Sequence, residues 1–283
     1  MQRYMPAMAR ISAQNLPFMK MHGLGNDFVV VDARGVDVKM TPELTQALAD
    51  RHRGVGFDQL AVITHGRDLA LTFFNADGST SGACGNATRC IAAHEMSRTG
   101  VQSLNIDVTG RGMLSAVLRP DGVVAVNMGA PATSWDKIPL SRDLDTLHLP
   151  IDGDPVGTGM GNPHCTFFVE DVDDIDLAAR GADIEHHPLF PQRTNVQFAQ
   201  LVAPDHLRMR VWERGTGVTL ASGSSSCAVA VAAHRRGLTG RTVRVDLDGG
   251  TLEIDWREDG VWMAGPTAHV FDGVLTPSFL ASL

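Results

Sequence analysis

The stretch "ASGSSSCAVAVAAHRRG" at residues 221–237 decides the fold, because an earlier stretch, "SGACGNATRCIAA" at 81–93, has the same shape. In both, a residue between Ala and Gly is followed by small polar residues, a cysteine and a run of small residues. The earlier copy holds Cys84 at that position, and the later copy holds Ser222. The likeness indicates that the chain repeats itself.

Other segments recur in the same order along the chain. The segments "GLGNDFVVVD" (23–32), "FDQLAV" (57–62) and "NIDVTGRGMLSAVL" (105–118) match "GMGNPHCTFFVE" (159–170), "RTNVQF" (193–198) and "RVDLDGGTLEIDW" (244–256). Matched residues are separated by 136 to 139 positions. The repeat predicts an α/β protein of two similar, pseudo-symmetric domains, with a linker near residues 128–139. Equivalent loops would then face each other across a cleft, which is a common place for a small-molecule site.

Each copy is predicted to hold one enclosed helix. The stretch 224–236 is small and apolar on every side until His234, as a helix surrounded by a sheet requires. The stretch 86–98 takes the same place in the first copy, and Gly100 and Gly237 provide the C-terminal stops. Alternating apolar runs predict strands at 28–31, 69–74, 165–169 and 207–212.

Composition excludes several classes of function. The net charge of −8 over 283 residues, without any long Lys/Arg run, argues against nucleic acid. No window approaches the roughly 18 apolar residues of a membrane helix. Residues 1–17 lack the apolar core of a signal peptide, so we expect a cytoplasmic protein. Four cysteines without a CxxC pair predict free thiols, and His186 and His187 lack further ligands at metal-binding spacing, so no metal is expected.

Cys84 and Ser222 lie immediately before the first turns of the two helices, where unpaired N–H groups favour negative charge. A thiol at such a place is expected to ionise more readily than a free thiol. The same amides suit a carboxylate. Acid–base groups on opposite sides of a carboxylate-bearing carbon are the arrangement that inverts a stereocentre. None of the three lysines has a recognisable phosphate-binding context, so no pyridoxal phosphate or other cofactor is expected.

Six ordered motifs carry a resemblance to a known family. The segments "MHGLGNDF", "FNADGS" followed by "CGN", "GNPH", "TNVQF", and "ERGTG" leading to "ASGSSSCA" are similar to those of diaminopimelate epimerases, from Phe18 to "GPTAHVFDG" near the end. The resemblance implies a cofactor-independent amino-acid epimerase of lysine and peptidoglycan biosynthesis. Such an enzyme interconverts LL- and meso-2,6-diaminopimelate through a pair of cysteines.

The family's fold is two α/β domains, each a mixed, barrel-like sheet wrapped around a central helix, with the final strand returning to the first domain. The resemblance therefore implies a first domain of residues 1–129 plus 266–283 and a second of residues 130–265. It also allows a homodimer.

Site roles follow from the same resemblance. The implied catalytic set is Cys84, Ser222 in place of the family's second cysteine, His164 and Glu213. The implied substrate-binding residues are Asn26, Gln59, Asn75, Gly85, Asn86, Asn162, Asn195, Glu213, Arg214, Gly223 and Ser224. The fork of Arg214 suits a distal carboxylate, and Glu213 suits an ammonium group.

Ser222 is the main departure from the family pattern, whether the exchange for cysteine was introduced or natural, and it predicts strongly reduced turnover. Ala87, for a usual Gly, and the segment "STSGA" before Cys84 are smaller departures. Two alternatives remain open. One is a one-base racemase, isomerase or dehydratase acting on another amino acid, although such a substrate would leave Glu213 and Arg214 unpaired. The other is a catalytically silent amino-acid-binding homologue.

Overall fold

The structure is a computed structural model that describes residues 15–36, 38–82 and 84–283. The first half of the chain contains β1 (Leu16–Gly23), β2 (Asn26–Asp32), α1 (Pro42–Ala49), β3 (Gln59–Thr64), β4 (Leu69–Asn75), β5 (Thr80–Ser81), α2 (Gly85–Thr99), β6 (Ser103–Val108), β7 (Gly112–Leu118) and β8 (Val124–Asn127). The second half contains β9 (Val156–Gly159), β10 (Pro163–Phe168), α3 (Leu177–Glu185), β11 (Asn195–Ala203), β12 (His206–Glu213), β13 (Gly217–Thr219), α4 (Gly223–Arg235), β14 (Thr242–Leu247), β15 (Gly250–Arg257) and β16 (Gly260–Ala264). The chain then continues into β17 (Ala268–Leu275) and α5 (Pro277–Leu280).

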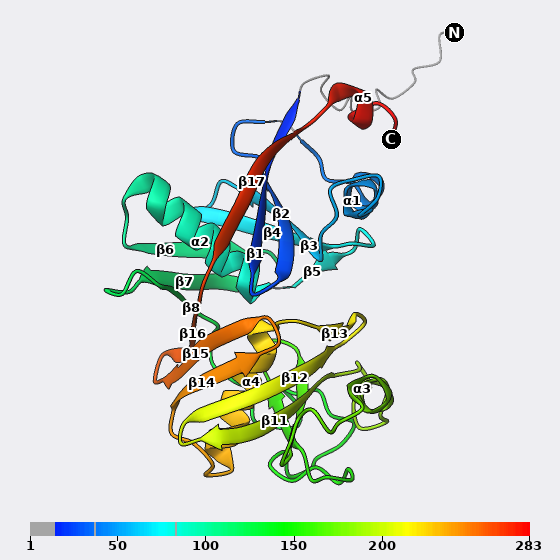
Figure 1. The fold of residues 1–283 in the computed structure, drawn as a ribbon, viewed down its shortest axis with the longest axis vertical. Coiled ribbons are helices and arrows are strands. Elements are labelled where there is room, and N and C mark those ends of the chain that lie inside the picture. Colours follow the sequence, from blue (N-terminus) through cyan, green and yellow to red (C-terminus); the bar gives the residue numbers. More distant parts are fainter. Residues whose placement is uncertain (1–14, 37, 83) are drawn as a thin grey trace.

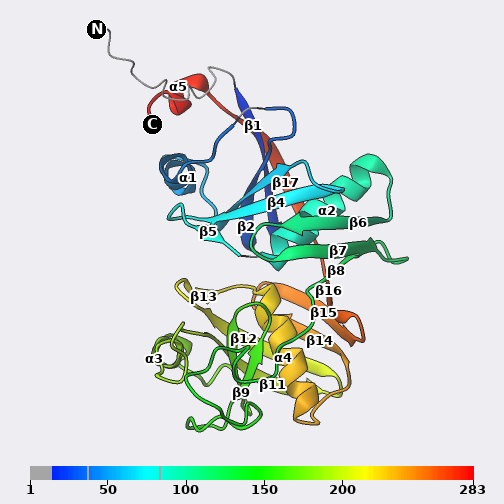
Figure 2. The same cartoon turned by 180° about the vertical axis from the view of Figure 1, so that it is seen from behind.

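The order of elements repeats, as the matched segments predict. Both halves run through two strands, a helix, three strands, a second helix and three strands. The pairing repeats as well: β2 and β3 are parallel with Phe28 opposite Gln59, and β10 and β11 are parallel with His164 opposite Asn195. These two pairs occupy equivalent places in the matched segments. In Figures 1 and 2 the two halves lie one above the other along the long axis.

The two halves share one mixed sheet. All 17 strands assigned in the described residues are connected by pairing, whereas two separate sheets were expected. The connection is the antiparallel pair β8–β16, in which Val126 lies opposite Met263. The chain end then returns to the first half, because β17 pairs with β1 (Figure 1). This return is the one that the resemblance implies.

The two enclosed helices begin and end within a residue or two of the predicted places. In α4, every residue from Ser225 to Ala233 is buried. The helix α2 ends at Gly100, whose φ of 78° is left-handed and therefore favours glycine. Arg89 in α2 is an exception to the expected small and apolar pattern, since its side chain is fully buried.

The outer helices α1 and α3 were not predicted, and they correct the picture of a sheet wrapped around one helix. Each covers the outer face of its half. Val29 of β2 packs with Leu44 and Leu48 of α1, while its neighbour Val30 faces the central core. A sequence signal was present, because Thr41 caps the first turn of α1 ahead of Pro42.

The four predicted strands all lie within observed strands, β2, β4, β10 and β12, except that Val169 falls just past the end of β10. A central core of buried side chains continues from one half to the other and surrounds both α2 and α4. In the described part of the chain, no helix is long and apolar enough to cross a membrane.

Candidate active site

The starts of α2 and α4 converge at the junction of the two halves. Cys84 is the N-cap of α2, and Ser222 is the N-cap of α4. A methyl group added at Gly223 would lie 3.7 Å from the backbone nitrogen of Asn86, so the two helix starts are in near contact. A cavity of about 430 Å³ lies at this point, within the usual size range of small-molecule sites.

Nearly all of the predicted site residues line this one cavity. From the first half come Asn26, Gln59, Asn75, Cys84, Gly85 and Asn86, and from the second half come Asn162, Asn195, Glu213, Arg214, Ser222, Gly223 and Ser224. His164 does not line the cavity and lies directly behind Asn162. The structure therefore brings the sequence-predicted set together, with His164 in the supporting layer.

Sequence reasoning missed several wall residues. Asp58, Arg111, Thr216 and Thr219 also line the cavity. Asp58 stands next to Gln59 inside a matched segment, so the repeat could have drawn attention to it. Arg111 lies in the turn between β6 and β7 and had no comparable signal. Its guanidinium donates to the carbonyl oxygens of Met160 and Met128, at 2.9 Å and 2.5 Å, and so links the turn to the second half.

Asn26 holds the Cys84 side of the cavity in a fixed orientation. The Cys84 sulfur accepts a hydrogen bond from the backbone N–H of Ala87 at 3.4 Å, and the thiol lies 3.8 Å from Oδ1 of Asn26. Nδ2 of Asn26 donates to Oδ2 of Asp58 at 3.0 Å. Because Asp58 takes the amide nitrogen, the amide oxygen must face the thiol.

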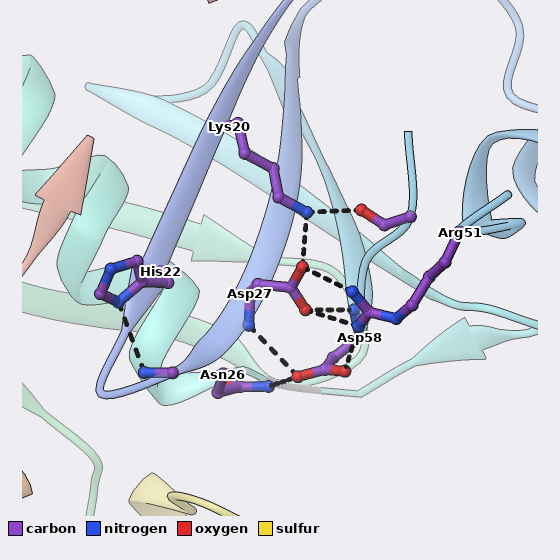
Figure 3. Close-up of polar contacts among 8 residues, drawn as sticks. Lys20, His22, Asn26, Asp27, Arg51 and Asp58 are labelled. Atoms are coloured by element: carbon purple, nitrogen blue, oxygen red, sulfur yellow. Dashed lines mark hydrogen bonds and ion pairs between the residues drawn. The ribbon is translucent and has the colours of Figure 1, made fainter. Parts of the chain in front are cut away.

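A charged cluster fixes Asp58 in turn (Figure 3). Arg51 bridges the carboxylates of Asp27 and Asp58, with N···O distances of 2.8 Å and 2.9 Å. Lys20 also contacts Asp27, at 2.5 Å. Burial acts to raise the pKa of Asp27, but hydrogen bonds from Arg51 and Lys20 lower it overall, so its carboxylate stays ionised. The cluster thus positions Asn26 from outside the cavity.

The expectation of a readily ionised Cys84 is wrong for the ligand-free cavity. Burial raises the pKa of the Cys84 thiol to about 12. A helix N-terminus contributes at most about 2 kcal/mol, or roughly 1.5 pKa units. Full burial shifts a pKa by up to about 3–5 units in the opposite direction. Desolvation therefore outweighs the helix start, and Cys84 is a protonated thiol in this state.

Glu213 lies behind Ser222 on the opposite side. The Ser222 hydroxyl donates to Oε2 of Glu213 at 2.8 Å, and the Thr219 hydroxyl donates to Oε1 at 2.7 Å. Burial raises the pKa of the Glu213 carboxyl, and these two hydrogen bonds only partly offset that effect. The two sides of the cavity thus differ: one presents a thiol, and the other a hydroxyl backed by a carboxylate.

His164 is fully buried and serves as a support. Its ring nitrogens lie 2.8 Å from Oδ1 of Asn162 and 3.1 Å from Nε2 of Gln197. Burial, with the nearby charges of Arg214 and Arg111, lowers its pKa to about 3, so the imidazole is neutral near pH 7. The arrangement orients the amide of Asn162 in the cavity wall.

Arg214 brings a cation to the cavity. Its backbone N–H donates to Oδ1 of Asn195 at 3.0 Å, and Nδ2 of Asn195 donates to the carbonyl oxygen of Pro163 at 2.9 Å. One guanidinium nitrogen donates to the carbonyl oxygen of Gln192 at 3.0 Å. Asn195 therefore places Arg214, whose remaining donors suit a carboxylate.

The fold defines a class of proteins. The chain superposes on a phenazine biosynthesis protein of the PhzF family from Bacillus anthracis with a TM-score of 0.66 at 16% identity, over 93% of this chain and 99% of that one. A hydroxyproline epimerase from Agrobacterium vitis gives a TM-score of 0.64 at 13% identity, over 92% and 91%. At these identities the likeness establishes the fold alone: a mixed α/β fold of the diaminopimelate epimerase and PhzF type.

Sequence comparison is more specific. The family model "Diaminopimelate epimerase" matches residues 18–134 and 157–270. The diaminopimelate epimerase of Rhodospirillum centenum is 51% identical over 272 residues, 93% of each chain. That of Acidiphilium cryptum is 50% identical over 273 residues, 94% of this chain and 98% of the relative. The chain belongs to the diaminopimelate epimerase family.

Proposed function

We propose that this protein epimerises 2,6-diaminopimelate between its LL and meso forms, a step of lysine and peptidoglycan precursor synthesis. The observation that carries the proposal is the meeting of two helix starts in one cavity, with Cys84 at one and Ser222 at the other. Family membership supports the substrate. The reacting carboxylate would be held by the first-turn amides of α2 and α4.

The rest of the cavity suits a second amino-acid head. Arg214 offers a planar fork for the distal carboxylate, and Glu213 offers an acceptor for an ammonium group. The amides of Asn26, Asn162 and Asn195 are held in fixed orientations by their neighbours. The site is thus preorganised for a polar, zwitterionic substrate.

The direct test is turnover. Purified protein would be incubated separately with LL- and meso-diaminopimelate, and the isomers would be separated by chiral chromatography. We expect conversion in both directions, slower than for the Ser222→Cys variant. Calorimetry on the same samples separates an enzyme from a silent homologue, since tight binding without conversion in either variant would contradict the proposal.

We also propose the domain division implied by the family: residues 1–129 plus 266–283, and residues 130–265. The pairing of β17 with β1 supports placing the chain end in the first domain. The homodimer and the cytoplasmic location stay predictions. Sedimentation at several concentrations tests the first, and cell fractionation tests the second.

A further inference from the structure

A chain of buried hydrogen bonds runs behind the cavity wall from Ser222 to Asn162. The two hydroxyl oxygens of Ser222 and Ser225 lie 2.9 Å apart, and Nε2 of Gln197 donates to Ser225 Oγ at 3.1 Å. The same nitrogen lies 3.1 Å from Nδ1 of His164, whose Nε2 reaches Asn162. The side chains of Ser225, Gln197 and His164 are fully buried. Inside the protein, each donor therefore needs a defined acceptor.

Thr166 sets the direction of this chain. Its hydroxyl donates to Oε1 of Gln197 at 3.1 Å, so the amide nitrogen of Gln197 must face His164 and Ser225. That nitrogen has two hydrogens, one for each neighbour. Nδ1 of His164 is then an acceptor, and Nε2–H donates to Asn162. The Ser225 oxygen likewise accepts from Gln197.

The direction continues to the cavity. The hydrogen of Ser222 goes to the Glu213 carboxylate at 2.8 Å. The 2.9 Å contact between the two serines must therefore use the hydrogen of Ser225. A hydroxyl oxygen has one hydrogen and two acceptor positions. Ser222 has given its hydrogen and filled one position, so its second position is left for a proton from the cavity that it lines.

We propose that Ser222 and Glu213 together form the proton acceptor on their side of the cavity, with Ser225 as a positioning residue. The inference rests on the proposed function and deepens it. The α-proton of bound diaminopimelate passes to Ser222 Oγ while the hydroxyl proton of Ser222 passes to Glu213 Oε2. The serine is unchanged at the end of the step, and Glu213 is protonated.

The electrons and protons balance with Cys84 as the partner. The electron pair of the broken C–H bond remains on the α-carbon and spreads into the adjacent carboxylate, which the helix-start amides stabilise. The Cys84 thiol then gives its proton to the opposite face of that carbon and becomes a thiolate. The protonated state of Cys84 and the raised pKa of Glu213 both suit this direction. The reverse reaction uses the same groups with their protons exchanged.

The test isolates the Ser222 side in a Cys84→Ala background. Each diaminopimelate isomer is incubated in D₂O, and α-deuteration is followed by mass spectrometry. We expect slow exchange with retained configuration for one isomer only. Adding Glu213→Gln or Ser222→Ala should slow that exchange by about 100-fold or more, the usual effect of losing a positioned acid–base group.

A double-mutant cycle separates proton acceptance from substrate binding by Glu213. A cysteine at position 222 has its own acidic proton and needs no carboxylate behind it. Glu213→Gln should therefore cost less than about 10-fold when Ser222→Cys is also present, against about 100-fold when Ser222 is retained. Equal losses in the two backgrounds would overturn the relay, because Glu213 would then act only on substrate.

Neighbouring serines provide matched variants. Ser225→Ala should slow exchange of the isomer that faces Ser222 by about 10-fold and leave the isomer that faces Cys84 unchanged when Cys84 is present. Ser226→Ala is the control, because its hydroxyl donates to the backbone carbonyl of Ser222 outside the relay and no change is expected. Absence of any exchange in Cys84→Ala would also overturn the relay. Epimerisation by Ser222→Cys with Cys84 intact would show that the proposed function survives that failure.

Discussion

Replacing Ser222 by cysteine tests the two-sided reading of the cavity most directly. The Ser222 oxygen lies 2.8 Å from Glu213 Oε2 and 2.9 Å from Ser225 Oγ. Polar contacts of sulfur in this protein are longer: 3.4 Å for Cys84 with Ala87, and 3.4 Å for Cys90 with the carbonyl of His22. A sulfur at position 222 must therefore move by roughly 0.5 Å, and overpacking of this kind costs about 1–3 kcal/mol.

The expected gain in turnover combines two effects. A positioned acid–base group typically contributes about 10²- to 10⁴-fold, and the Ser222–Glu213 pair supplies part of that contribution already. We therefore expect Ser222→Cys to raise kcat by about 10- to 100-fold. Adding Ser225→Ala removes the closer crowding of the sulfur and should raise kcat further.

The assay is conversion of LL- to meso-diaminopimelate, followed by chiral chromatography with a reductant present. The reductant is needed because two facing cysteines can oxidise to a disulfide. Thermal unfolding and calorimetry control for folding and substrate binding. If neither variant gains activity while both fold and bind substrate, or if the Ser222 protein already equals them, the two helix starts do not act as an acid–base pair.

Three further predictions follow from the contacts. Arg214→Ala should weaken diaminopimelate binding by about 100-fold in calorimetry, because charge-assisted hydrogen bonds contribute about 1.5–3 kcal/mol each, and exposed Arg142→Ala should not weaken it. Mild oxidant should leave the starts of α2 and α4 uncrosslinked in peptide mapping, and a disulfide from Cys84 to Cys90, Cys165 or Cys227 in the folded protein would contradict the geometry. Burial acts to raise the pKa of Glu95, but Arg34 and Arg98 lower it to about 2, so its stabilisation is present above the unfolded value near 4.5 and is lost as pH falls through about 2. Glu95→Gln should reduce the free energy of unfolding by about 2 kcal/mol at pH 7 in urea denaturation, and the difference should shrink by pH 3.

The repeated architecture could be predicted because each half states it independently. Equivalent residues such as Gln59 and Asn195 take part in the same parallel strand pairs. Glycines after the helices mark their ends. The joining of both halves into one sheet could not be predicted, because the pairing of β8 with β16 depends on how the halves meet. No local pattern encodes that contact.

The site was predictable in membership and less so in chemistry. The motifs gathered the wall residues correctly, but the state of Cys84 depends on burial, which three-dimensional packing decides. Gln197 and Ser225 escaped notice, although both stand at regular spacing from predicted residues. Gln197 is two positions after Asn195 in a strand, and Ser225 is three after Ser222 in a helix. These periods place side chains on the same face.

The asymmetry between the two sides limits what kinetics can reveal. A catalyst leaves the equilibrium between the LL and meso isomers unchanged, so the ratio of kcat/KM in the two directions is fixed whatever the strengths of the two bases. A thiol facing a serine–glutamate pair therefore cannot make the reaction run one way. The asymmetry must appear instead in isotope exchange. The acceptor on the Ser222 side exchanges its proton through a buried carboxylate, whereas Cys84 lines the cavity directly. We expect deuterium from solvent to enter the two isomers at different rates relative to inversion, and equal ratios for both would argue for equivalent acid–base groups.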